Sequence, residues 1–183
     1  MKSFVLNPEP FLTKDILNKL EENNIFINDY AKQYFAHPLF STEEAETTVI
    51  TIASLREIGF ENGATLNELF QTIPQIGLKP CPVNTGVFLR LFWKDQPQSR
   101  TSILSGTHRS PDGAVTVLSE ILEQDNAFPK GLYLRKVEGK PWLRGYVCDE
   151  TYCFSEDDLF AFEEIITENH DCLFCDVMKK KEF

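Results

Sequence analysis

The spacing of apolar side chains changes along the chain, from helical periods at the start to strand periods later. One apolar stripe of helical spacing follows Thr13, which can cap a helix, and a second begins at Asn28. The second stripe ends before Pro38, because a residue that precedes proline leaves the helical region. The stripes consist of Ile16, Leu17, Leu20 and of Tyr30, Ala31, Tyr34, Phe35. Residues 1–40 are therefore predicted to form a helical hairpin.

One strand and two short helices are predicted next. Residues 47–54 are dense in β-branched side chains, which favour strands. Ser54 with Glu57, and Thr65 with Glu68, have capping-box spacing, in which a hydroxyl and a carboxylate satisfy free amide donors at a helix start. The predicted left-handed C-terminal caps of these helices are Gly59 and Gly77.

The second half of the chain has the pattern of a sheet. Residues 87–94 are rich in aromatic and branched side chains and are predicted as a strand. Residues 102–105 and 114–119 are predicted as strands that pair with each other. Residues 132–137 and 142–147 are predicted to form a hairpin.

Residues 155–166 fit two elements. Ser155 and Asp158 have the spacing of a helix cap, whereas the run from Leu159 to Phe162 also fits a short buried strand. A strand to about Phe162 is favoured, with a C-terminal helix or tail over 163–183.

These elements predict an α+β fold in which N-terminal helices pack on a mainly antiparallel sheet. The 183 residues are of single-domain size. The predicted domain 1–183 has a helical segment over 1–40, a core over 47–162 and the terminal element over 163–183.

Composition adds an acidic balance, with 28 Asp and Glu against 18 Lys and Arg and a net charge near −10. Such a surface disfavours nucleic acid, whose binding depends on clustered cations. It serves solubility, or it suits a protein partner with a basic surface. No apolar run approaches the roughly 18 residues of a membrane span, and no export signal is evident. With five cysteines, an odd number, we expect reduced thiols and a cytoplasmic location.

Four of the cysteines have a spacing close to that of a zinc ribbon. Cys148 and Cys153 form one pair, Cys172 and Cys175 the other, and His170 can replace one thiolate. Bulky apolar neighbours around these cysteines favour packed thiols instead. A redox role for the second pair lacks the strand-to-helix setting that lowers a thiol pKa. No cofactor is predicted, and zinc is kept as an alternative.

A polar loop carries the candidate catalytic groups. His108, Arg109 and Asp112 lie near Ser105 and Ser110, which would suit a hydrolase with a serine nucleophile. Turn chemistry alone explains this composition, so the catalytic interpretation is the alternative. The lone thiol of Cys81, between two prolines, is interpreted as a packed turn residue.

Two acidic clusters are interpreted as solvated capping carboxylates. They consist of Glu43, Glu44, Glu46 and of Glu156, Asp157, Asp158.

Aromatic side chains offer a possible partner-binding surface. Trp93 and Trp142 would anchor a partner if strand alternation placed them on an outer face. The predicted cationic rim of that surface is Arg90, Arg135 and Arg144. The competing interpretation places the large rings in the core.

Several stretches carry a resemblance to known sequences: LREIGFENGATLNELF (55–70), GLKPCPVNTGVFLRL (77–91), DQP (95–97), FPKGLYLR (128–135), WLRGY (142–146) and SEDDLFAF (155–162). In this order they resemble a little-characterised bacterial family of hypothetical proteins, some of which carry a helicase label. The label does not transfer, because the chain has no G-x-x-x-x-G-K-[ST] phosphate loop. The resemblance implies fold-determining roles for Gly59, Gly77, Pro82, Gly86, Trp142 and Gly145, and supplies no catalytic residue.

The function predicted from these observations is that of a small acidic, cytoplasmic protein-binding or regulatory protein, of inhibitor or immunity type and without catalytic activity. Two alternatives stay open. One is a hydrolase that uses the His108, Arg109 and Asp112 loop. The other is an interaction module stabilised by zinc on the four cysteines.

Overall fold

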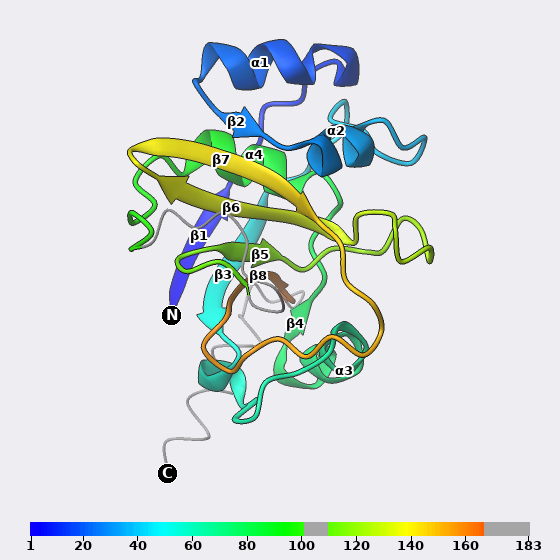
Figure 1. Cartoon of the computed structure of the whole chain (residues 1–183), viewed down its shortest axis with the longest axis vertical. Coiled ribbons are helices and arrows are strands. Elements are labelled where there is room, and N and C mark those ends of the chain that lie inside the picture. Colours follow the sequence, from blue (N-terminus) through cyan, green and yellow to red (C-terminus); the bar gives the residue numbers. More distant parts are fainter. Residues whose placement is uncertain (101–109, 167–183) are drawn as a thin grey trace.

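The computed structural model describes residues 1–100 and 110–166, and a mixed β-sheet forms its centre (Figure 1). The strand order is β1-β3-β8-β5-β6-β7-β2, with β4 paired to β8. The strands are β1 (Lys2–Leu6), β2 (Phe26–Ile27), β3 (Thr48–Ser54), β4 (Leu78–Lys79), β5 (Val115–Val117), β6 (Gly131–Val137), β7 (Lys140–Tyr146) and β8 (Leu159–Glu164). Helices and sheet together make the fold α+β, as predicted.

The sheet is mixed, so the prediction of a mainly antiparallel sheet is wrong. The β5–β8 and β2–β7 pairs are parallel, and the other pairs are antiparallel. Both parallel pairs join strands that are far apart in the sequence. Local hairpin patterns therefore carry no signal for them.

Two hydrophobic clusters lie against the sheet. The helices are α1 (Ile16–Glu22), α2 (Asp29–Phe35), α3 (Leu66–Thr72) and α4 (Thr85–Phe92), with 3₁₀ turns η1 (Thr13–Asp15), η2 (Arg56–Ile58) and η3 (Ile73–Ile76). One cluster joins α1, α2 and α4 to the sheet, and the other joins η2, α3 and η3 to it. Figure 1 shows α1 and α2 at one end of the molecule and α3 at the other.

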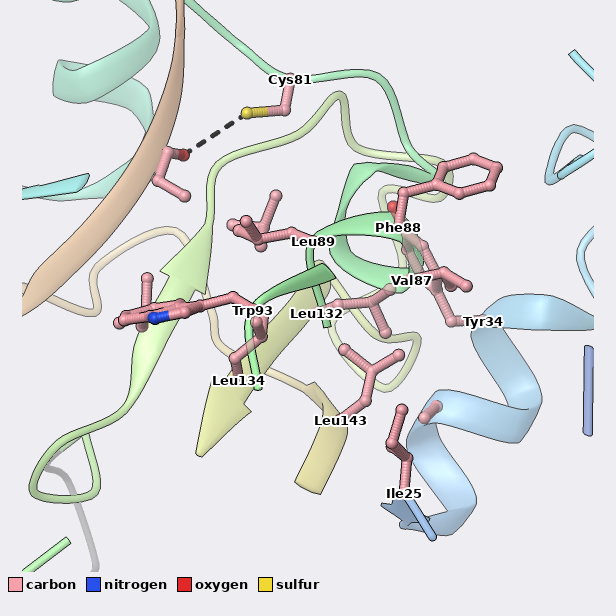
Figure 2. Packing of buried hydrophobic residues seen from close by; sticks show 14 of the residues in the cluster. Ile25, Tyr34, Cys81, Val87, Phe88, Leu89, Trp93, Leu132, Leu134 and Leu143 are labelled. Carbon is pink, nitrogen blue, oxygen red and sulfur yellow. Dashed lines mark hydrogen bonds between the residues drawn. The ribbon is translucent and has the colours of Figure 1, made fainter. Parts of the chain in front are cut away.

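The prediction of a strand over 87–94 is wrong, because this segment is largely helix α4. Every residue from Thr85 to Arg90 is buried. Figure 2 shows Val87 and Leu89 among Leu132 and Leu134 of β6. A short run of aromatic and branched residues fits a buried strand and a buried helix turn equally well, so residue preference alone could not tell the two apart.

The N-terminal helices lie where the sequence predicts them, but two strands join them. Asn28 caps α2, since its side chain accepts a hydrogen bond from the Ala31 amide at 3.0 Å. β2 separates α1 from α2 and pairs with β7, and β1 precedes both helices. The segment 1–40 therefore supplies both ends of the sheet, which the helical prediction missed.

Local signals at caps and turns are confirmed. Thr65 and Glu68 form a reciprocal capping box on α3. Gly59 and Gly77 both adopt the left-handed conformation at the ends of 3₁₀ turns. The β6–β7 hairpin turns through Gly139, which has a φ of 75°.

Two sheet predictions have mixed outcomes. The predicted strand 114–119 contains β5, but β6 and β8 occupy its two edges at Val115 and Thr116. The predicted strand 102–105 and the loop residues 106–109 lie outside the described residues, so its pairing stays a prediction. β8 confirms a strand near Phe162 and extends to Glu164, whereas 167–183 lie outside the description.

Candidate partner-binding groove

A groove of about 270 Å³ lies at the end of the sheet where β1 ends and β3 begins. We call it the sheet-end groove; its lining residues are Leu6, Pro8, Glu44, Ala45, Glu46, Thr48, Lys79, Pro82, Asn84, Thr85, Phe88 and Glu163. The strand register builds its floor, because Leu6 pairs with Thr48 and Lys79 pairs with Glu163. The first turn of α4 and the segment 44–46 supply its walls.

Carboxylates outnumber cations around the sheet-end groove. Lys79 Nζ lies 3.0 Å from Glu163 Oε1, so these two charges offset each other. The exposed side chains of Glu44 and Glu46 take part in no hydrogen bond or ion pair within the described residues. The groove therefore carries an excess of negative charge.

The wall that holds these carboxylates is fixed by Asn84. Its side-chain amide donates to the carbonyl oxygens of Ser41 at 2.8 Å and Glu44 at 2.9 Å. Asn84 itself precedes α4 and is buried, so the loop is tied to the most buried helix of the fold. This anchoring keeps the backbone at Glu44 in place without using its carboxylate.

A second hollow of about 230 Å³ continues the sheet-end groove and shares Thr48, Lys79 and Glu163 with it. The hydroxyl of Thr48 is buried and has no hydrogen-bond partner within the described residues. It adds an uncharged polar group to the floor. A ligand with cationic and hydrogen-bonding groups therefore finds both kinds of partner here.

Three residues of the predicted partner-binding surface are buried, so their placement on an outer face is wrong. Trp93 is 7% exposed and Arg90 only 1%, because α4 carries both into the core. Arg90 donates to Gln96 Oε1 at 2.5 Å and to the Trp93 carbonyl, and burial lowers its pKa to about 10. Arg135 is buried as well, and its Nε donates to Ser99 Oγ at 3.0 Å.

The other two residues of that surface, Trp142 and Arg144, are half-buried on β7. The Trp142 ring lies 5.1 Å from that of Phe26, which is 41% exposed. The Arg144 guanidinium stands 5.2 Å from the Trp142 ring. A role of Trp142 and Arg144 in binding a partner stays a prediction.

The loop predicted as catalytic is only partly described. His108 and Arg109 lie outside the described residues. Asp112 Oδ2 accepts a hydrogen bond from the Arg100 amide at 2.6 Å and so joins the two sides of the loop. The hydrolase alternative stays a prediction.

Cys81 is buried beneath the sheet, where its thiol donates to the Ala161 carbonyl at 3.6 Å (Figure 2). Burial raises the pKa of this thiol well above its ordinary value. The protonated thiol is a poor nucleophile. The geometry agrees with a packed turn residue.

The predicted zinc site cannot be assembled from the described residues alone, because Cys172 and Cys175 lie outside them. Cys148 is half-buried, and burial raises its pKa to about 11. Cys153 is exposed, with its sulfur 3.6 Å from the Phe154 carbonyl. Within the described ranges no three potential ligands cluster. Zinc on the four cysteines stays a prediction.

The residues of the sheet-end groove were not predicted as a site. Glu44 and Glu46 were interpreted as solvated carboxylates, and Lys79 and Glu163 were not singled out. These four come from three separate parts of the chain, which only the order of strands β3, β8 and β4 brings together. No local motif could have identified them.

Within the described ranges, no helix combines the length and apolar character that crossing a bilayer requires. Comparison with family models, curated proteins and solved structures finds no match to this chain. The resemblance to the little-characterised bacterial family therefore stays a prediction.

Proposed function

We propose that this chain is a protein-binding protein, and that the sheet-end groove receives a basic segment of its partner. One observation carries the proposal: Glu44 and Glu46 border the groove and meet no cation within the described residues. A lysine or arginine side chain supplies the missing charge and donates hydrogen bonds to carboxylates. The acidic net charge of −10 favours approach of a basic partner over a longer range.

The groove by itself has room for one long side chain. Its volume of about 270 Å³ lies just below the range of about 300–1,000 Å³ that is usual for small-molecule sites. The adjoining hollow extends it along the sheet end. A short peptide segment can therefore place one cationic side chain in the groove and a neighbouring group in the hollow.

A regulatory role of inhibitor or immunity type follows if the bound segment belongs to the partner's own functional surface. Such a protein acts by covering that surface and needs no catalytic group of its own. Among the described residues, Cys81, Cys148 and Cys153 are free thiols.

The test measures binding of a lysine–serine peptide of about eight residues, a length of about 26 Å when extended. Titration calorimetry at low ionic strength compares the native chain with Glu44→Gln/Glu46→Gln. We expect the double substitution to weaken binding about tenfold, since two partly screened ion pairs contribute about 1 kcal/mol or less each.

The control is Glu22→Gln/Glu61→Gln, which changes net charge equally at two exposed positions outside the groove. Its affinity should fall by less than about twofold, because screened surface charges contribute little at a distance. Equal losses in the two double variants, or no binding by the native chain, would refute the groove as the site.

A further inference from the structure

Within residues 1–100 and 110–166, strand β1 leaves one edge of the sheet open. It stands at the end of the strand order, and its one partner in this part of the chain is β3 (Figure 1). Within the described residues, no backbone hydrogen bond outside that pairing involves residues 2–6. In an antiparallel pair alternate residues turn their N–H and C=O groups away from the neighbour, so β1 presents unpaired donors and acceptors along its outer edge.

This edge carries only one of the features that usually protect an edge strand, the charge of Lys2. Such strands are commonly very short or interrupted by charge or proline. β2, at the other end of the sheet, is only two residues long, whereas β1 has five residues with Lys2 as its single charge. Val5 on β1 is 63% exposed. The edge is therefore suited to pairing with another strand.

An exposed apolar surface, formed by Phe92 and Phe4, lies beside the open edge. Phe92 at the end of α4 is 52% exposed, and its ring centroid lies 5.8 Å from that of Phe4 on β1. In an added strand, side chains alternate between the two faces. Alternate apolar residues on one face of that strand would cover Phe92, and those on the other face would lie beside Val5.

The open edge leads to the sheet-end groove. Leu6, the last residue of β1, and Pro8 both line the groove. The corner is fixed by a hydrogen bond of 2.8 Å from the Thr47 hydroxyl to the Asn7 side chain. A segment that follows β1 to its end therefore arrives next to Glu44 and Glu46.

We propose that the partner's basic segment binds as an added β-strand along the outer edge of β1, with a lysine or arginine at one end in the sheet-end groove. This inference rests on the proposed function and names the form of its ligand. Backbone hydrogen bonds to β1 hold the segment, apolar side chains cover Val5 and Phe92, and the groove carboxylates select a cation at the end.

The probes are two peptides with consecutive valines at the centre, which place valine on both strand faces, and lysine at both ends, each of about eight residues so that they outreach β1. One has free backbone amides, and in the other the central backbone nitrogens are methylated. The methylated peptide keeps its charge but cannot donate to a strand. We expect it to bind at least about tenfold more weakly, in accordance with the loss of several backbone hydrogen bonds.

Amide hydrogen exchange locates the bound peptide. With the unmethylated peptide, the outward-facing alternate amides among residues 2–6 should exchange at least about tenfold more slowly. The amides that face β3 are already protected by it, so their exchange should change little. Unchanged exchange along β1, or equal affinity of the two peptides, overturns strand addition.

The two proposals fail in different ways. If both peptides bind equally and Glu44→Gln/Glu46→Gln weakens both, the proposed groove function holds and strand addition is refuted. Absence of binding by both removes the two together. Protection of β1 without peptide, together with a dimer in sedimentation, assigns the edge to a second copy of the chain and likewise overturns the proposal.

Discussion

Two buried polar residues, Arg90 and Gln96, connect separate elements of the fold. Arg90 lies in the core with its guanidinium held by Gln96 Oε1 and the Trp93 carbonyl. The amide of Gln96 donates in turn to the carbonyl oxygens of Gly113 and Leu134, both at 3.1 Å. Gln96 thus joins α4 to β6 and to the segment before β5.

Gln96→Ala should therefore destabilise the fold strongly. The substitution leaves an Arg90 nitrogen and two carbonyl oxygens without their partner, and we expect a loss of about 3 kcal/mol in the free energy of unfolding. Urea denaturation measures it. The control is Gln98→Ala, whose exposed side chain accepts one bond from the Gly139 amide and should cost below about 1 kcal/mol. Similar losses in both variants would contradict the network.

Cys81 is a buried thiol and Cys153 is an exposed one, so their reactivities can be compared in the same protein. Burial raises the pKa of Cys81 and blocks access to it, so reaction waits for local opening. With an excess of an aromatic disulfide reagent at neutral pH, we expect Cys81 to label at least about a hundredfold more slowly than Cys153. Labelled peptides identified by mass spectrometry give the two rates. Comparable rates would indicate an accessible, activated Cys81.

At the scale of elements, close backbone approach positions α2 on β7. A β-carbon at Gly145 would lie 2.6 Å from the Tyr30 carbonyl carbon and 2.7 Å from the Ala31 nitrogen. The Asn28 side chain reinforces the contact, since it accepts from the Gly145 amide at 2.8 Å and donates to its carbonyl at 2.9 Å. The helix can dock here because the strand residue has no side chain.

Gly145→Ala should displace α2 and lower the free energy of unfolding by about 3 kcal/mol, at the upper end of overpacking costs. The control is Gly131→Ala, where the nearest atoms to the new β-carbon belong to side chains at 3.2 Å or more. That variant should cost about half as much or less, because side chains yield more readily than backbone. A tolerated Gly145→Ala in chemical denaturation would disprove the close docking.

At the scale of the whole molecule, burial of weak acids makes the fold sensitive to alkali. Burial raises the pKa of Cys148 from 9.0 to about 11 and that of Tyr34 from 10.0 to about 12. The unfolded chain releases these protons at the lower values. The stability that these two protonated groups contribute is therefore fully present below pH 9. It is lost progressively as the pH rises through the folded-state pKa values of about 11 for Cys148 and about 12 for Tyr34.

We expect the urea midpoint to fall between pH 9 and 11, and Cys148→Ser to reduce that fall because it removes one of the titrating groups. Cys153→Ser, which removes an exposed thiol, is the control and should keep the pH dependence of the native chain. A midpoint that rises with pH in this window would reverse the sign derived from burial.

Features that depend on neighbours along the chain could be predicted from the residues alone. The Thr65 capping box, the left-handed caps at Gly59 and Gly77 and the β6–β7 hairpin were all predicted, because a few adjacent residues supply the interacting groups. The acidic balance was also readable from composition, and it suited either solubility or a partner with a basic surface.

Features that depend on contacts between distant residues became visible in the folded chain and not before. Residues 85–92 form helix α4 although their aromatic and branched side chains favour a strand, because packing against β6 and β7 outweighs the local preference of so short a run. Strand β1 and the parallel β5–β8 pair require partners remote in sequence. The sheet-end groove likewise exists because strand order brings Glu44, Glu163 and Lys79 together, and no local spacing encodes that order.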